Sequence, residues 1–239
     1  MAHLDQISFI NFFRDFYIKN NFKKNIDILE VGSYDVNGAI RNIFPFCNNY
    51  LGVDLAEGSN VDIVLDGDQI DTLNRKFDLI ISCECFEHAK NWKLIFNKMC
   101  QISNENSFIV ISVASTGRNE HGTSRSGNWQ SPGTNDDYYK NLTKKDFINN
   151  FDLNKIFSNY FFFYNINSYD LYFVGIKGHV NKKNLIFDIN KQLKLHFKKK
   201  KIRKILVYIY SCIINEELRQ NIYFFKLKLK KKLYSLFNK

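Results

Sequence analysis

The chain has 239 residues and 45% hydrophobic content, which suit one globular domain with its own core and an appendage. Its five cysteines form no Cys-x-x-Cys pair, and an odd number without a signal peptide argues against disulfide bonds and for reduced thiols in the cytoplasm. A formal net charge of +10 is typical of nucleic-acid-binding proteins, but residues 1–180 hold 17 Lys and Arg against 21 Asp and Glu. The positive excess therefore lies in residues 181–239, and the acidic body argues against a nucleic-acid substrate.

The order of apolar segments predicts an α/β fold with a doubly wound sheet. Helical periodicity indicates a leading amphipathic helix over Ile7–Phe22. Short apolar strands, with helices between them, are expected at Ile26–Val31 (strand), Asn37–Phe44 (helix), Tyr50–Asp54 (strand), Val61–Leu65 (strand), Phe77–Ser82 (strand), Trp92–Ile102 (helix) and Phe108–Val113 (strand). A long polar loop over Ala114–Asp137 follows, then a capped helix that begins at Thr143 and a strand pair at Lys155–Asn165 and Asp170–Lys177.

The first two strands and the turn between them form a candidate nucleoside site. Gly32 ends the first strand and lets backbone N–H groups approach a ligand without a Cβ clash. Asp54 closes the second strand, where a carboxylate is placed to accept both hydroxyls of a ribose. Tyr34 stands where a G-x-G-x-x-G fingerprint has its second glycine, so this turn does not close on a pyrophosphate. The segment favours a nucleoside ligand without pyrophosphate over NAD.

Five motifs carry a resemblance to a known family: ILEVGSYDVNG, YLGVDLAEGSNVDIV, FDLIISCECFEHAKNW, GRNEHGT and DDYYKNLTKKDF. From about Ile26 to Phe147 the chain resembles the class I S-adenosylmethionine-dependent methyltransferases, in particular a bacterial group associated with surface-glycan modification. The resemblance implies a Rossmann-like, seven-stranded sheet with S-adenosylmethionine as cofactor. It also implies a set of cofactor-binding residues: Glu30, Gly32 and Ser33 around the methionine part, Asp54 on the ribose, Asp66 beside the adenine amine, and with them Tyr34, Gly38, Leu55, Gly67, Asp68 and Ser82.

The segment directly after the fourth strand, Glu84-Cys85-Phe86-Glu87-His88, combines two carboxylates and an imidazole. If Glu84 opens a helix, then Glu84, Glu87 and His88 project from one face, and His121 reaches the same crevice from the loop after the next strand. These four residues form a candidate site for Mg²⁺ or Mn²⁺. They are similar to the metal set of plant small-RNA 2′-O-methyltransferases and to a set found in ubiquinone-pathway O-methyltransferases. In many relatives, however, the Glu-His pair holds no metal; Glu then caps the helix and His packs near the cofactor.

Both arrangements support methyl transfer to oxygen, because an unactivated hydroxyl is a poor nucleophile until its proton is taken. His88 and His121 are the candidate bases, and a metal would instead lower the pKa of the hydroxyl. Side chains in the loop after the fifth strand suit a polyhydroxylated or anionic acceptor. They are Arg118, Asn119, Glu120, Thr123, Arg125, Trp129, Asp136, Tyr138 and Tyr139.

Residues 181–239 are expected to form two or three basic helices, a tail separate from the methyltransferase domain of residues 1–180. The apolar run ILVYIYSCII, preceded by KKKKIRK, is too short to span a bilayer as a helix. One interpretation is a basic amphipathic segment that lies on an anionic membrane or contacts an acidic partner. The other is a helical extension packed on the body or in a dimer, with solvated lysines.

These observations predict an O-methyltransferase that acts on a sugar or sugar-phosphate during biosynthesis of a cell-surface glycan, such as a capsule or lipopolysaccharide. The acceptor would be a small polar glycan-type molecule, and the protein cytoplasmic or peripheral at the inner face of the membrane. Two alternatives stay open. One is an RNA 2′-O-methyltransferase whose tail binds RNA, and the other is a non-catalytic binding module that keeps the cofactor fold as a scaffold.

Overall fold

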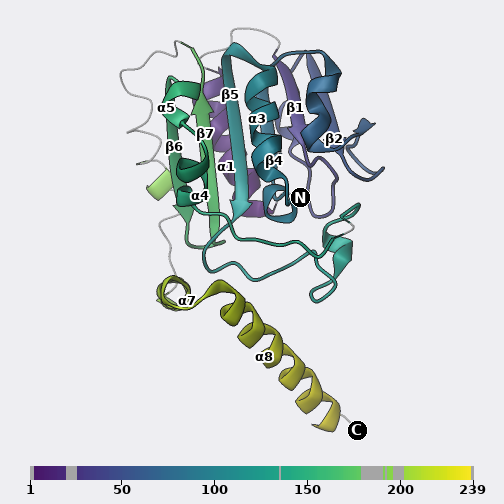
Figure 1. Cartoon of the computed structure of the whole chain (residues 1–239), viewed down its shortest axis with the longest axis vertical. Helices are drawn as coiled ribbons and strands as arrows, with labels where there is room; N and C mark the ends of the chain where they lie inside the picture. Colours follow the sequence, from purple (N-terminus) through teal and green to yellow (C-terminus); the bar gives the residue numbers. More distant parts are fainter. Residues whose placement is uncertain are drawn as a thin grey trace.

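The computed structural model describes residues 3–19, 26–134, 136–178, 191, 193–195 and 202–237, the last five as backbone alone. Within these residues the strands form one seven-stranded sheet in the order β3-β2-β1-β4-β5-β7-β6 (Figure 1). The first five strands of the chain pair in parallel, and β7 pairs antiparallel with β5 and β6. The bounds are β1 Asp27–Val31, β2 Asn49–Asp54, β3 Ile63–Val64, β4 Phe77–Cys83, β5 Ser103–Ala114, β6 Asn159–Asn165 and β7 Asp170–Ile176. The predicted doubly wound, seven-stranded sheet is confirmed.

Helices cover both faces of this sheet, because neighbouring side chains of a strand point to opposite sides. On one face, Phe9 and Phe13 of α1 (Leu4–Phe13) share a buried cluster with Ile28. On the other face, Phe96 of α3 (Trp92–Ile102) shares a cluster with the next residue, Leu29. Two short helices, α4 (Lys144–Asn150) and α5 (Leu153–Ile156), lie on the α3 side (Figure 1).

Two predicted helices differ from the structure. A regular helix over Asn37–Phe44 is wrong, since this stretch holds a single 3₁₀ turn at Arg41–Ile43. Gly38 at φ 146° interrupts helical geometry, and Phe44, before Pro45, leaves it at φ −117° and ψ 58°. The leading helix starts three residues earlier than predicted and continues as a π-helix over Arg14–Ile18. The predicted end of that helix lies outside the described residues.

The structure also tests the predictions for the short helices and turns. Thr143 does cap α4, because its side chain and that of Asp146 form a reciprocal capping box. The predicted strand start at Lys155 is wrong, since α5 extends to Ile156 and β6 begins at Asn159. Further 3₁₀ turns lie at Gly67–Leu73, Phe86–His88 and Asn128–Gln130. The five cysteines, all of them described, are free thiols.

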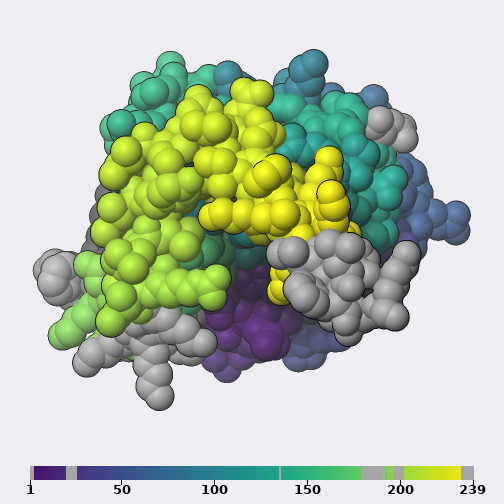
Figure 2. Space-filling model, turned by 90° about the horizontal axis from the view of Figure 1, so that it is seen from below, coloured from purple at the N-terminus to yellow at the C-terminus, as the bar shows by residue number. Residues whose placement is uncertain are grey.

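The C-terminal part contains two helices, α7 (Ile202–Ile213) and α8 (Glu216–Phe237). They lie beyond the edge of the sheet at which the parallel strands end (Figure 1). Seen from below, both helices run across this face of the molecule (Figure 2). No helix in the described part of the chain combines the length and apolar content that crossing a bilayer requires.

Candidate active site

A cavity of about 600 Å³ opens at the carboxyl ends of β1, β2 and β4. This is where ligands bind in open α/β sheets. Gly32 turns the chain there at φ +82°, and a Cβ atom on it would lie 2.7 Å from Cβ of Cys85. Asp54 accepts hydrogen bonds from the N–H groups of Tyr34 (2.9 Å) and Leu55 (2.7 Å), which fixes its carboxylate at the cavity wall. Of the predicted cofactor-binding residues, this wall contains Gly32, Tyr34, Asp54, Leu55, Asp66 and Gly67.

The other predicted cofactor residues, all within the described part of the chain, do not line this cavity: Glu30, Ser33, Gly38, Asp68 and Ser82. Glu30 is buried and accepts a hydrogen bond from the hydroxyl of Tyr50 (2.7 Å). Burial raises its pKa to about 7, although the bond from Tyr50 acts in the opposite direction. Asp68 accepts a hydrogen bond from the side-chain amide of Asn91 (2.7 Å) and so orders the cavity rim. These residues support the cavity from behind.

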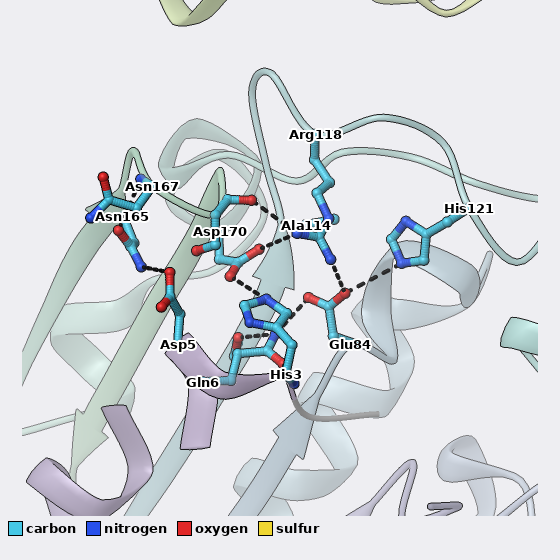
Figure 3. A network of polar contacts seen from close by, with 12 residues as sticks. His3, Asp5, Gln6, Glu84, Ala114, Arg118, His121, Asn165, Asn167 and Asp170 are labelled. Carbon is cyan, nitrogen blue, oxygen red and sulfur yellow. Dashed lines mark hydrogen bonds and ion pairs between the residues drawn. The ribbon is translucent and has the colours of Figure 1, made fainter. Parts of the chain in front are cut away.

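Glu84 does not open a helix. Its φ of +52° is left-handed, so Glu84 does not share a helical face with Glu87 and His88. Glu84 accepts a hydrogen bond from the side-chain amide of Gln6 (2.6 Å), and its other oxygen lies 3.2 Å from Arg118 and 3.3 Å from His121 (Figure 3). Burial alone would raise the pKa of Glu84, but the charges of Arg118 and His121 outweigh burial and hold it below the ordinary value. Glu84 is therefore an ionised carboxylate.

Three members of this network were missed by sequence reasoning, namely His3, Gln6 and Asp170. Nε2 of His3 lies 2.8 Å from Asp170, whose carboxylate is also 3.8 Å from Arg118 (Figure 3). Burial lowers the pKa of His3, yet the hydrogen bond and charge of Asp170 raise it above the ordinary value overall. His3 and Gln6 are polar residues at the start of the otherwise apolar helix α1, and this polarity was the sequence signal that could have pointed to them.

Glu87 and His88 belong to the 3₁₀ turn that follows Glu84, and they also lie beside His121. Ligand atoms of these three residues lie within 4.8 Å of one another. Oε1 of Glu87 accepts the N–H of Ala114 (3.1 Å), but Oε2 of Glu87 and both ring nitrogens of His88 are buried and have no hydrogen-bond partner among the described residues. Burial and then the charge of Glu84 raise the pKa of Glu87 well above its ordinary value, and burial lowers the pKa of His88 to about 3. Unpaired buried polar atoms of this kind indicate a ligand.

The three predicted metal ligands Glu87, His88 and His121 thus gather in one place, whereas Glu84 is occupied by its cationic and amide partners. The ring of Tyr139 completes the group, with its centroid 5.4 Å from that of His88 and 5.1 Å from that of His121. The phenol of Tyr139 donates to the side-chain oxygen of Asn141 (2.9 Å).

A second cavity, of about 420 Å³, lies on the far side of Glu84. Glu84 and Gln130 line both cavities. The remaining wall of the second cavity is mostly polar: His3, Asn37, Gly117, Arg118, Asn119, Glu120, His121, Ser126, Ser168, Tyr169, Lys204 and Tyr223. Of the loop residues predicted to meet an acceptor, Arg118, Asn119 and Glu120 line it, Asp136 lines the first cavity, and Trp129 is largely exposed.

The tail helices hold this second cavity together. The guanidinium of Arg219 on α8 donates to the backbone oxygens of Gly117 (3.4 Å) and Arg118 and to the side-chain oxygen of Asn119 (3.1 Å). Gln220 accepts the N–H of Glu120 (2.9 Å) and donates to the carbonyl of Arg118 (3.1 Å). Both tail residues are 5% exposed, so the contact is a packed one. The tail therefore forms part of the site.

Comparison with known proteins gives a family and a fold. Residues 7–162 match the family model described as "Methyltransferase domain". Among solved structures, the N-terminal domain of EvdMO1, crystallised in the presence of SAH and D-fucose, is similar with a TM-score of 0.51 and 16% identity, over 74% of this chain and 85% of that one. The plantazolicin methyltransferase BamL, in complex with a triazolic desmethylPZN analog and SAH, has a TM-score of 0.51 and 16% identity, over 84% and 80%. No curated protein matches the chain.

Proposed function

Because the chain belongs to the methyltransferase-domain family, we propose that its second cavity holds the methyl acceptor and that methyl transfer goes to an oxygen atom of a small polar molecule. The protein is an S-adenosylmethionine-dependent methyltransferase. The first cavity fits this cofactor, since it opens at the carboxyl ends of the parallel strands and the Asp54 carboxylate on its wall is able to accept the hydroxyls of a ribose. The cofactor supplies the electrophilic methyl group and leaves as S-adenosylhomocysteine (SAH).

One observation carries the proposal: a cavity lined by amides, hydroxyls and paired charges shares two lining residues, Glu84 and Gln130, with the first cavity. Such a wall offers hydrogen-bond donors and acceptors on every side, which suits a sugar or sugar-phosphate and leaves an apolar acceptor poorly matched. A sugar acceptor is also compatible with the fold, since the EvdMO1 domain was crystallised with D-fucose present. We therefore favour an acceptor of the cell-surface glycan type.

His121 is placed to take the acceptor's proton. Its Nδ1 lies 3.2 Å from the carbonyl oxygen of Asn119, and its Nε2 faces the Glu84 carboxylate at 3.3 Å. In the tautomer that donates from Nδ1 to Asn119, Nε2 holds the lone pair, and an acceptor hydroxyl must enter between Nε2 and Glu84 to give up its proton there. As the acceptor oxygen bonds to the methyl carbon and the carbon–sulfur bond breaks, the hydroxyl proton passes to Nε2. The ionised Glu84, 3.3 Å away, then stabilises the imidazolium. Burial lowers the pKa of His88 to about 3, so its imidazole is a weak base.

The donor set of Glu87, His88 and His121 also fits a divalent cation such as Mn²⁺ or Mg²⁺, because Oε2 of Glu87 and both ring nitrogens of His88 are buried without a hydrogen-bond partner among the described residues and His121 adds a third ligand. A bound cation would lower the pKa of an acceptor hydroxyl and hold two neighbouring oxygens. Calorimetric titration with Mn²⁺ should show binding that Glu87→Gln abolishes and that Asp71→Asn, a half-buried acid of another turn paired with Lys98, retains. Equal binding to parent and Glu87→Gln, or no binding, would remove the metal from the proposal.

The acceptor class is tested with full-length protein, S-adenosylmethionine and a panel of nucleotide sugars, sugar phosphates and a structured RNA, with SAH release as the readout. We expect turnover on a sugar-class acceptor. His121→Gln should lower kcat by roughly 10²–10⁴ and leave SAH affinity unchanged, whereas Ser124→Ala in the same loop should leave both unchanged. Turnover on RNA alone would replace the glycan assignment. SAH binding without turnover on any acceptor would favour the binding module.

A further inference from the structure

Helix α7 packs on the body with its polar and aromatic side, so its apolar side faces outward. Its body-facing side presents Lys204, Tyr208 and Ser211 at helical spacing. The ring centroid of Tyr208 lies 4.9 Å from that of Tyr164, with the two rings tilted to one another. The carbonyl oxygen of Lys204 accepts from the hydroxyl of Tyr169 (3.4 Å), and Ser211 is buried. A surface helix normally turns its apolar stripe toward the core. In α7 the aromatic and polar side packs inward instead.

The apolar residues of α7 lie on the outward side. Ile202, Leu206, Ile209 and Ile213 follow one another at intervals of four, three and four residues, and they are 75%, 61%, 49% and 79% exposed. At 1.5 Å per residue they form a stripe about 17 Å long. A contiguous exposed apolar stripe on a soluble body marks an interaction surface.

Helix α8 also exposes apolar side chains. Leu218, Phe225 and Leu229 are 53%, 67% and 47% exposed, and exposed lysines lie beside them at Lys226, Lys228, Lys230, Lys231 and Lys232. Residues 202–232 contain eight Lys and Arg against two Glu. The exposed surface of the tail thus combines apolar side chains with a positive field.

We propose that the outward faces of α7 and α8 dock on the surface of an anionic lipid membrane. Apolar side chains beside lysines are the composition of helices that lie in the interface plane, where the apolar side enters the acyl boundary and the ammonium groups meet lipid phosphates. A second copy of the chain would bring the same positive surface against itself, and like charges oppose that contact. A nucleic acid would use the lysines but would leave the apolar stripe in water.

The docking surface and the second cavity are built from the same helices. Lys204 of α7 and Tyr223 of α8 line the cavity, and Arg219 holds its loop. An acceptor in that cavity therefore lies next to the proposed membrane contact. The docking itself rests on the outward faces and stands whatever the acceptor is.

Sedimentation of the full-length protein with vesicles tests the proposal. Vesicles of phosphatidylcholine mixed with phosphatidylglycerol should carry the protein down, vesicles of phosphatidylcholine alone should carry far less, and added NaCl should reduce the binding. The double variant Leu206→Glu with Ile213→Glu should bind at least about tenfold more weakly, because it removes two of the most exposed apolar contacts. Leu94→Glu, an exposed leucine of α3, should bind as the parent does.

SAH affinity and the unfolding temperature of the double variant should match those of the parent, which shows that the body still folds. Equal vesicle binding by the double variant and the parent, or no binding to anionic vesicles by the parent, would overturn the proposal. Light scattering provides a further check. If the parent is a dimer and the double variant is a monomer, the apolar stripe of α7 contacts a second copy of the chain instead. If the parent binds a structured RNA but no vesicles, the lysines contact nucleic acid instead.

Discussion

Removal of the Arg219 side chain should loosen the loop that lines the second cavity. In Arg219→Ala, the carbonyl of Gly117 and the side-chain oxygen of Asn119 lose charged donors at 3.4 and 3.1 Å, while the carbonyl of Arg118 keeps Gln220 and Asn141. Hydrogen bonds to a charged donor contribute about 1.5–3 kcal/mol, and the longer of these two is weak. We therefore expect the free energy of local opening at residues 115–122 to fall by about 2 kcal/mol, which corresponds to roughly 30-fold faster exchange.

Hydrogen–deuterium exchange with SAH bound measures this effect, because the cofactor holds the first cavity in the same state in both proteins. Lys226→Ala is the matched control, since it removes an exposed cation from the same helix without touching the loop. Peptides of α3 should exchange at the parent rate. If residues 115–122 exchange equally in the parent and Arg219→Ala, or if Lys226→Ala accelerates them as much, the tail does not hold the loop in the way the contacts indicate.

Three further variants test other parts of the site. Asp54→Ala should weaken SAH binding by about 2–3 kcal/mol in calorimetry, because it removes the ribose acceptor and the anchor of the Tyr34 N–H; unchanged affinity would contradict the cofactor placement. Gly32→Ala should lower the unfolding temperature, since its φ is +82° and its Cβ would meet Cys85. The pKa of Glu30 is raised from 4.5 to about 7, so ionisation of Glu30 reduces stability as the pH rises between these values. The free energy of unfolding of Glu30→Gln should therefore equal that of the parent at pH 4 and exceed it above pH 7 by up to about 3 kcal/mol, as measured by thermal unfolding. An equal pH dependence of both proteins would show that Glu30 does not titrate in this range.

The strands and the cofactor cavity could be predicted because their signals are local. Apolar runs ended by polar residues marked the parallel strands, and Gly32 and Asp54 stand at the ends of two neighbouring ones. The helix over Asn37–Phe44 could not be predicted correctly from apolar spacing alone, since Gly38 at a positive φ outweighs that spacing. The spacing of Glu84, Glu87 and His88 predicted one helical face, but a left-handed Glu84 sends its carboxylate to a different set of partners.

Contacts between segments that lie far apart in the sequence could not be predicted, because the residues around each partner show no pattern that indicates the contact. Gln6 meets Glu84 across 78 residues of chain, and Arg219 meets Asn119 across 100. The lysine-rich composition of the tail favoured an appendage, and no sequence pattern singled out Arg219 or Gln220 within it. The division at residue 180 stays a prediction about domains, but α8 packs on the loop of the body that precedes it. The assignment of individual residues to cofactor, base and metal likewise awaits the experiments above.

Glu84 lines both cavities, so in the proposed reaction its carboxylate would be a common neighbour of the methyl donor and the methyl acceptor. A ligand that turns this carboxylate, or strengthens its contact with Arg118, changes the wall that the other ligand meets. Equilibrium coupling between two sites is reciprocal, so any factor by which the cofactor alters acceptor affinity equals the factor by which the acceptor alters cofactor affinity.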